Sequence, residues 1–214
     1  MPNICVIGTG NWGMNHVRTL AELNALGGIV ETDASKRNEI KNTFQDVKVF
    51  ETVSEAIEYG FDGYTVATLP ESHFMIGKEV LEAGFPVLIE KPMTLDVGES
   101  MELVQLAHQK NLPLMVGHVL LFHPAIRKIK SIIEEGKIGN LQYIYSNRLN
   151  LGQVRTEENV FWSFAPHDIS IFQYFVERQP IEIFAKGSSF ISDQISDTTI
   201  MMMEYPENIS AHIF

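Results

Sequence analysis

A glycine-rich turn near the amino terminus limits the possible folds of this chain more than any other feature. Gly8, Gly10 and Gly13 follow the pattern G-x-G-x-x-G, and the apolar, β-branched run 3–7 precedes them. Apolar residues then recur at helical spacing over 14–21. This strand–turn–helix context predicts a site for the phosphates of a dinucleotide, whereas glycines at the same spacing in another context indicate only a turn.

Each glycine of the turn has its own physical reason. Gly8 permits the tight turn, Gly10 leaves the backbone accessible to a pyrophosphate, and Gly13 lets helix and strand pack closely. The unpaired N–H groups and the dipole at the start of the helix attract an anion. We therefore predict cofactor contacts along this loop, from Gly8, Gly10, Asn11, Trp12 and Gly13.

Two acidic residues further along the chain bear on the identity of the cofactor. A strand is predicted over 27–30, and Glu31 and Asp33 follow it. A carboxylate about 20 residues after the glycines holds the ribose hydroxyls of NAD and repels the 2′-phosphate of NADP. Glu31 is favoured because it lies at the strand tip, while Asp33 also suits a helix N-cap. NAD is the expected cofactor, and the nearby Lys36 and Arg37 keep NADP possible.

Composition narrows the class of protein. The 214 residues carry a net charge of −11, which argues against a nucleic-acid partner or an anionic membrane surface. No apolar run approaches the roughly 20 residues that a membrane helix needs. The single cysteine, Cys5, lies inside the first predicted strand and fits a reducing compartment. We expect a cytoplasmic globular protein without nucleic-acid or membrane partners.

The first half of the chain alternates strands and helices, which predicts a doubly wound parallel sheet of the Rossmann type over residues 1–120. Small residues end the strand 61–68, so Thr68 and Pro70 are expected beside the cofactor. His73 opens the next helix, and the sequence leaves open whether it contacts the cofactor or solvent. The helices that follow strands are expected to be capped by Ser54, by Ser72 or its neighbour, and by Thr94.

The pattern changes after residue 120 and predicts a partial α+β domain over 121–214, with an open, largely antiparallel sheet. The chain stops inside the last predicted strand, and a bare apolar edge promotes aggregation. We therefore expect a fragment of a longer protein or an edge that another subunit covers. The predicted elements are a helix from Pro124 that Gly136 ends, a long strand over 141–150, a loop with Arg155, Asn159 and Trp162, a helix from 166 through Phe175, and strands over 181–190, 198–205 and 209–214.

Two short segments carry residues suited to catalysis, and no metal site is expected. Lys91, between Glu90 and Pro92, follows a predicted strand at the sheet edge where open α/β sheets bind ligands. It can donate a hydrogen bond to a substrate oxygen, or it is a surface lysine at a strand end. His167 is suited to accept a hydroxyl proton, and Asp168 to orient it or bind a substrate hydroxyl. The alternative is a charged pair at a helix amino terminus.

Together these segments resemble the Gfo/Idh/MocA oxidoreductases, a family named after glucose–fructose oxidoreductase, inositol dehydrogenase and a rhizopine-catabolism protein. The resemblance implies a Rossmann domain, a second domain whose open sheet mediates homo-oligomer formation, and NAD(P)-linked hydride transfer at an alcohol carbon of a sugar-like small molecule. It also implies that Lys91 is the catalytic lysine, that His167 transfers the proton, and that Asp168 is its neighbour in the site. Glu90, Lys91 and Pro92 are expected at the cofactor. The matching segments are 8–13, 90–92, 117–118, 122–125 and 167–168.

A narrower resemblance concerns the substrate. Segments 147–152, 154–155 and 165–169, with Trp162, are similar to nucleotide-sugar 3-dehydrogenases that act on UDP-N-acetylglucosamine-type uronates. Members of the family are usually much longer than this chain. The sequence thus predicts an NAD(P)-dependent dehydrogenase of a sugar or nucleotide-sugar alcohol; the alternatives are a non-catalytic dinucleotide- or sugar-sensing relative and a fragment of an inositol or sugar dehydrogenase. The expected substrate-binding residues are Arg148 and Arg155, as bidentate donors to phosphate or carboxylate or else as surface ion pairs, with Asn159 and Trp162.

Overall fold

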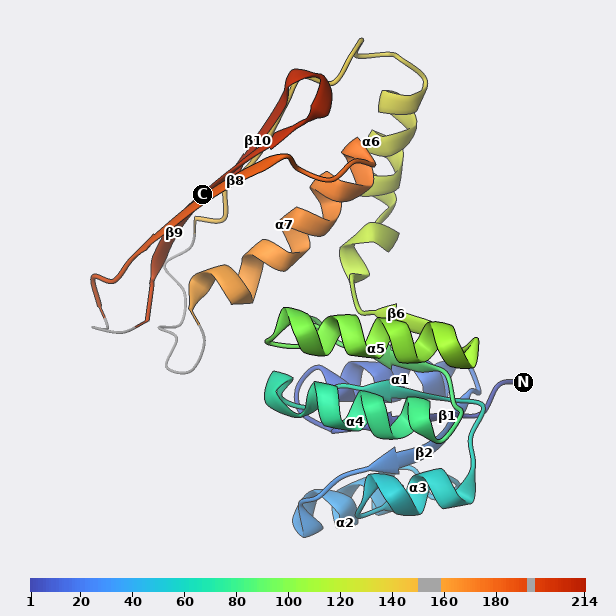
Figure 1. Ribbon diagram of the computed structural model, residues 1–214. Coiled ribbons are helices and arrows are strands. Elements are labelled where there is room, and N and C mark those ends of the chain that lie inside the picture. Colours follow the sequence, from blue (N-terminus) through green and yellow to red (C-terminus); the bar gives the residue numbers. More distant parts are fainter. Residues whose placement is uncertain (150–158, 192–194) are drawn as a thin grey trace. The chain divides into compact units, whose positions relative to one another are not determined.

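The computed structural model describes residues 1–149, 159–191 and 195–214 (Figure 1). The chain forms two compact units, Met1–Gly117 and His118–Phe214, and each is described by itself. The sequence-based boundary was placed after residue 120. Arg155, which the sequence assigns to substrate binding, lies outside the described residues.

The first unit is built on six described strands in the order β3-β2-β1-β4-β5-β6, all paired in parallel. This confirms the predicted doubly wound sheet. The order reverses between β1 and β4, and such a switch point is where open α/β sheets bind ligands beyond the carboxyl ends of their strands. The strands are β1 (Ile4–Ile7), β2 (Leu26–Val30), β3 (Lys48–Phe50), β4 (Gly63–Val66), β5 (Val87–Ile89) and β6 (Leu114–Val116).

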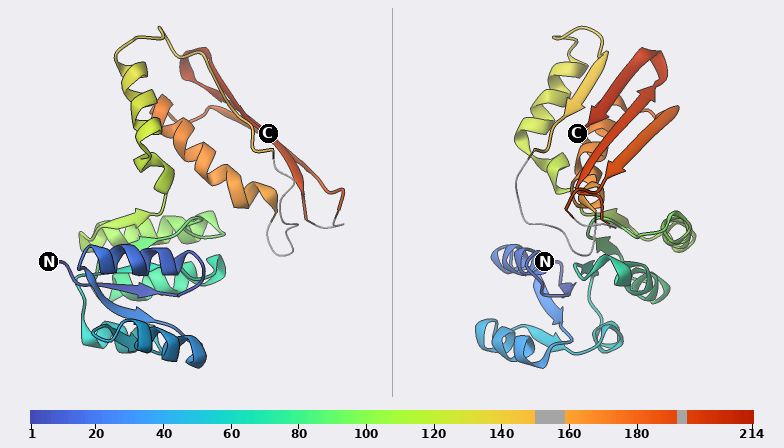
Figure 2. Two further views of the ribbon diagram at one scale, coloured as in Figure 1. Left: turned by 180° about the vertical axis from the view of Figure 1, so that it is seen from behind. Right: turned by 90° about the vertical axis from the view of Figure 1, so that its left-hand side faces the viewer.

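Helices cover both faces of this sheet (Figure 2). Val6 of β1 packs on one side with Val17 and Ile40, whereas its neighbours Cys5 and Ile7 belong to the core on the other side. Burial of both faces explains why the strands are continuously apolar rather than alternating. Helices α1 (Gly13–Glu22) and α2 (Ala34–Thr43) contribute to the first core, and α3 (Val53–Tyr59), α4 (Pro70–Glu82) and α5 (Val97–Lys110) to the second.

Three expected helix caps are wrong in detail. Thr52, not Ser54, caps α3 through a capping box in which Thr52 and Glu55 each accept a backbone N–H from the other. Asp96, not Thr94, caps α5 by accepting from the backbone of Glu99. Helix α4 begins at Pro70 with Leu69 as N-cap, so Ser72 lies inside its first turn. A proline at the first helical position was the stronger start signal, because its missing N–H is unpaired there in any case.

The second unit contains four described strands in the order β7-β10-β9-β8. The three carboxyl-terminal strands form the expected antiparallel meander, but β10 also pairs in parallel with β7, so the sheet is mixed. The expectation of a bare edge at the last strand is wrong, because β10 lies between β7 and β9. The strands are β7 (Tyr143–Ser146), shorter than predicted, β8 (Glu182–Ser188), β9 (Thr198–Tyr205) and β10 (Ile209–Ile213).

Helices α6 (Pro124–Glu134) and α7 (Val160–Val176) pack against one face of this sheet (Figures 1 and 2). Short 3-10 helices, Val119–Phe122 and Pro206–Asn208, complete the described elements. The predicted start of α7 at residue 166 is wrong. Asn159 is the N-cap and accepts from Trp162 N at 3.0 Å, so Pro166 lies inside the helix and His167 and Asp168 are well past its amino terminus. The alternative of a charged pair at a helix start is therefore excluded.

Candidate functional site

The glycine loop has the geometry that a dinucleotide site requires. Gly8 has φ +91°, and a Cβ there would lie 2.8 Å from Thr68 Cγ2. A Cβ on Gly13 would lie 2.1 Å from the carbonyl oxygen of Gly8. A Cβ on Gly10, by contrast, would meet no atom within 4 Å. Gly8 and Gly13 are thus required by packing, whereas Gly10 borders open space where a bound group fits.

The amino terminus of α1 completes this loop. Trp12 occupies the N-cap with helical φ and ψ, and among the described residues no side chain caps the helix and no acid lies in its first turn. The backbone N–H groups of its first turn are therefore not capped by a side chain, which suits a phosphate. Together with the space beside Gly10, this arrangement fits the pyrophosphate of a dinucleotide.

Glu31 joins the glycine loop to the carboxyl end of β2. Its buried carboxylate, 8% exposed, accepts from Thr9 N at 3.2 Å, from the Thr9 hydroxyl, and from Asp33 N at 2.9 Å. Burial raises the pKa of Glu31, but these hydrogen bonds and the charge of Lys36 outweigh it and hold the pKa below the usual 4.5. A carboxylate ionised at neutral pH therefore lies next to the loop.

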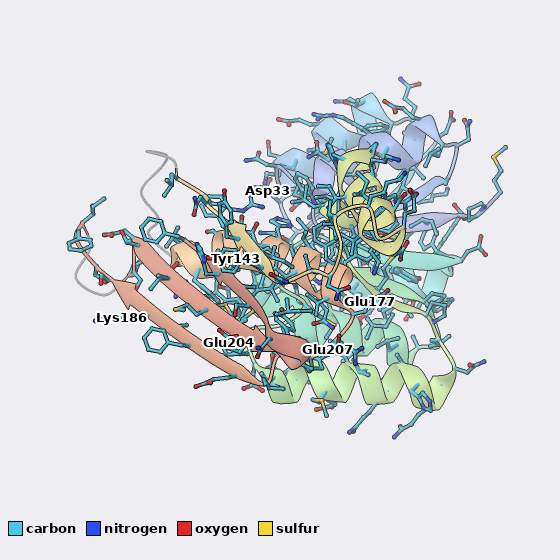
Figure 3. The ribbon with its side chains drawn as sticks, turned by 90° about the horizontal axis from the view of Figure 1, so that it is seen from above. Asp33, Tyr143, Glu177, Lys186, Glu204 and Glu207 are labelled. Carbon is cyan, nitrogen blue, oxygen red and sulfur yellow. The ribbon has the colours of Figure 1, made fainter. Side chains whose placement is uncertain are left out.

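Asp33 has a different role. Its carboxylate accepts from Ser35 N at 2.8 Å and Lys36 N at 3.0 Å and so caps α2; the residue is labelled in Figure 3. The sequence left open which acid holds the ribose and favoured Glu31; in the structure the Glu31 carboxylate is the one bound to Thr9 of the loop. Arg37 binds the Glu51 carboxylate at 2.9 Å and also donates to backbone carbonyls of Glu31 and Thr32.

Glu90 lies directly after β5 and faces the same loop. Its Oε1 accepts from Trp12 Nε1 at 2.6 Å and His16 Nε2 at 2.7 Å, and its Oε2 accepts from the backbone N–H of Lys91 at 3.2 Å. Sequence reasoning missed His16, although its position four residues after Trp12 puts both on one face of α1. The structure thus brings the first half of α1 and the start of the 90–92 segment together.

Lys91 and Pro92 follow, with a cis peptide bond between them. The ring of His73, 1% exposed, lies between two carbonyl oxygens: its Nδ1 is 2.8 Å from that of Pro92 and its Nε2 3.1 Å from that of Thr68. The alternative of a solvated His73 is therefore wrong. The imidazole connects the segments that follow β4 and β5, which also carry Thr68 and, at the first position of α4, Pro70.

In the second unit, Asp168 is bound by neighbours from the β7 end. Its carboxylate, 3% exposed, accepts from Ser146 Oγ at 2.7 Å and Arg148 Nε at 2.5 Å. The Arg148 backbone N–H in turn donates to the Phe214 carbonyl at 2.8 Å. Asp168 therefore orients Arg148, and this pairing had no local signal because 20 residues separate the two. Catalytic roles for His167 and Asp168 and substrate roles for Asn159 and Trp162 stay predictions.

The described part of the chain has neither a metal-ligand cluster nor a membrane-spanning helix. Within it, no three His, Cys, Asp or Glu side chains are grouped so that they could hold a metal ion. None of its helices combines the length and the apolar character needed to span a membrane.

Comparison with known proteins gives matches in both units. Residues 2–118 match the family described as "Oxidoreductase family, NAD-binding Rossmann fold", and residues 126–214 match the "GFO/IDH/MocA C-terminal domain". The UDP-N-acetylglucosamine 3-dehydrogenase of Acidithiobacillus ferrooxidans is 27% identical over 198 residues, covering 92% of this chain and 61% of that protein. The inositol 2-dehydrogenase of Corynebacterium glutamicum (strain R) is 22% identical, covering 95% of this chain and 64% of that protein.

Solved structures agree with these matches. The Acidithiobacillus ferrooxidans enzyme superposes with a TM-score of 0.88 at 25% identity, covering 99% of this chain and 66% of that chain. The scyllo-inositol dehydrogenase of Lactobacillus casei, solved with NAD(H) and scyllo-inositol, shares the fold with a TM-score of 0.89 at 20% identity, covering 100% of this chain and 68% of that chain. The present chain spans less than two thirds of the length of the curated relatives compared here. Because the family matches cover most of the sequence and the strand order is that of a Rossmann sheet, the chain belongs to the Gfo/Idh/MocA oxidoreductase family, with an NAD-binding Rossmann domain.

Proposed function

We propose that this chain carries the cofactor-binding and catalytic residues of an NAD-dependent dehydrogenase that acts on a secondary alcohol of a sugar or nucleotide sugar. The observation that carries the proposal is the open space beside Gly10 at the uncapped start of α1. The loop residues, with Thr68, Pro70, Lys91 and Pro92, are the proposed cofactor-binding set. A cytoplasmic location, supported by the single buried cysteine, is part of the proposal.

Preference for NAD over NADP rests on Glu31. Its ionised carboxylate beside the loop repels a 2′-phosphate and can accept from a ribose hydroxyl. Arg37 is paired with Glu51, so the nearby guanidinium already has a carboxylate partner. Titration calorimetry is expected to give tighter binding of NADH than of NADPH, and equal affinities would contradict the assignment of Glu31.

The proposed chemistry divides between two side chains. A bound nicotinamide supplies the hydride acceptor when the alcohol is oxidised. Lys91 donates a hydrogen bond to the substrate oxygen, and His167 accepts the hydroxyl proton. The proton and the hydride leave the same C–OH group, so the alcohol becomes a carbonyl.

The test is a Lys91→Met variant assayed for the appearance of reduced nicotinamide, with UDP-sugars and inositols as the substrate panel. Loss of a positioned proton-transfer or hydrogen-bonding group is expected to lower the rate at saturating substrate about 10²-fold or more. Lys41→Met, at an exposed position of α2, is the matched control. An undiminished Lys91→Met rate would remove the assigned role, and NADH binding without turnover in the parent chain would favour the sensing alternative.

Arg148 supports a substrate with an anionic group. Its Nε is engaged by buried Asp168, which orients the guanidinium, and the terminal nitrogens provide the paired donors that phosphate and carboxylate accept. The likeness to the UDP-N-acetylglucosamine 3-dehydrogenase favours a nucleotide sugar over an inositol. On this proposal Arg155, Asn159 and Trp162 complete the substrate contacts.

Self-association through the second sheet is the final part of the proposal. The face of this sheet opposite α7 carries exposed apolar and aromatic side chains, among them Tyr145, Phe184 and Met202. Tyr145 stacks on His212 of the neighbouring strand with ring centroids 5.6 Å apart. Exposed apolar faces of this kind mark interaction surfaces, and a second copy of the chain is the proposed occupant.

A further inference from the structure

Glu90 occupies a position where three segments of the first unit converge. It follows β5, it touches Trp12 and His16 of the glycine loop and α1, and it lies against Gly117 at the end of β6. Its side chain is nearly fully buried, with 7% of the residue exposed. A buried carboxylate is stable only when enough hydrogen-bond donors surround it. The donors around Glu90 therefore indicate which segments it fixes in place.

The two carboxylate oxygens hold different segments. Oε1 accepts from the indole N–H of Trp12 and from Nε2 of His16, at 2.6 and 2.7 Å. Oε2 accepts from the backbone N–H of Lys91 at 3.2 Å. One oxygen is therefore bound to the loop that borders the cofactor space, and the other to the main chain of the lysine.

The surroundings keep the carboxylate in this place. A Cβ at position 117 would lie 2.8 Å from the carboxylate carbon and from each of its oxygens, so the glycine at the end of β6 makes room for it. Burial raises the pKa of Glu90, but the hydrogen bonds from His16 and Trp12 and the charge of His16 reverse this and lower it overall. These donors select the ionised form, which can accept from all three partners at once.

We propose that Glu90 is a positioning residue that holds Trp12 of the glycine loop and the main chain of Lys91 in fixed relation, and that it acts on cofactor binding through Trp12. The family resemblance predicts that Glu90 contacts the cofactor directly, whereas its contacts in the structure are with Trp12, His16 and the Lys91 backbone. The part of this inference that concerns Lys91 rests on the proposed function, in which Lys91 contacts the substrate. The part that concerns cofactor binding is tested by NADH affinity alone.

The experiment is a double-mutant cycle on NADH affinity, measured by calorimetry with the whole chain, using Glu90→Gln, Trp12→Phe and the double variant. Glutamine keeps the shape but presents an NH2 group to a donor, so one bond is lost. Each single variant is expected to weaken NADH binding about tenfold, because each loses a hydrogen bond to a charged group. Both variants break the same bond, so the double variant is expected to bind NADH no more weakly than the weaker-binding single variant. The control is Glu79→Gln, because the Glu79 carboxylate accepts a hydrogen bond from Ser54 at the surface. This variant should bind NADH as tightly as the parent chain.

A spectroscopic readout separates this role from loss of folding. In a Trp162→Phe background Trp12 is the remaining tryptophan, and Glu90→Gln is expected to shift its emission while the thermal unfolding transition stays cooperative. Additive losses in the cycle, or an unchanged Trp12 emission in a folded Glu90→Gln protein, would overturn the inference. Failure of the parent chain to bind NADH would instead refute the proposed function.

Discussion

At the scale of single residues, two buried glutamates organise the first unit. Glu31 and Glu90 each follow a strand of the parallel sheet, and each binds donors from the glycine loop or the start of α1. For both, burial raises the pKa and the hydrogen bonds lower it by more, so the net shift is downward. Both side chains are therefore charged in the folded protein at neutral pH.

This downward shift predicts how stability depends on acid. A carboxyl group with a lowered folded pKa adds stability above its ordinary pKa of 4.5, and that stability is lost as the pH falls through the folded value. We expect Glu90→Gln to be less stable than the parent at neutral pH, with the difference narrowing below pH 4.5. Urea unfolding at neutral and acidic pH measures this, and a constant difference at all pH values would contradict it.

The glycines of the loop give a second prediction. Gly13→Ala places a methyl group 2.1 Å from a backbone oxygen and is expected to cost about 1–3 kcal/mol or more of unfolding free energy. Gly10→Ala meets nothing within 4 Å and should leave stability near that of the parent, yet weaken NADH binding by occupying the space for the pyrophosphate. Thermal unfolding and calorimetry distinguish the two; comparable NADH affinity for Gly10→Ala and the parent would refute the loop as the site.

At the scale of helices, caps explain where the elements begin. Thr52 starts α3, Asp96 starts α5 and Asn159 starts α7, and each side chain accepts a backbone N–H of the first turn. For α3 and α5 the sequence prediction chose a residue two positions away, because several serines and threonines satisfy the same local rule. For α7 it started the helix at residue 166 and left Asn159 in a loop. The candidate cap residues differ only in whether their side-chain oxygen reaches the unpaired backbone N–H groups of the first helical turn.

The cap of α3 can be tested by a matched pair. Thr52→Ala removes the capping box and is expected to lower the free energy of unfolding by about 1 kcal/mol. Ser54→Ala removes only an exposed hydrogen bond to Glu79, so its loss should be about 0.5 kcal/mol or less. Urea unfolding of the first unit's transition measures both, and a larger loss for Ser54→Ala would restore the original assignment.

At the scale of the whole molecule, the sheet of the second unit has two unlike faces. Met201 and Met203 of β9 are buried in the core with α7, whereas Met202 between them is 48% exposed. Met202 pairs with Phe184 of β8, which is 56% exposed. Figure 3 labels Tyr143, Lys186 and Glu204, which come from β7, β8 and β9 of this sheet.

If the chain self-associates through this face, a charged substitution on the face should weaken the association. In sedimentation velocity the parent chain is expected to associate with rising concentration, because the contact removes apolar surface from water. Met202→Glu puts a charge into that contact and should shift the population to monomer, whereas Lys41→Glu on α2 of the first unit should not. A parent chain that stays monomeric throughout would refute the proposed interface.

Much of the fold followed from local pattern. Spacing in the sequence predicted the turn at the three glycines, the alternation of strands and helices, and the meander of the last strands. The strand order, the parallel pairing of β10 with β7 and the pairing of Asp168 with Arg148 were not. These depend on which segments become neighbours in space, which periodicity within a segment does not encode.

The candidate site divides in the same way. By itself the sequence determined that residues 8–13 form a turn between strand and helix, because the space and backbone angles that glycine allows are local requirements. Only the tertiary structure decided that Glu31 lies beside the loop while Asp33 caps a helix, and that Glu90 binds Trp12 from 78 positions away. The physical reason is that a buried carboxylate takes its role from the donors that surround it, and strand order in the folded sheet selects those donors.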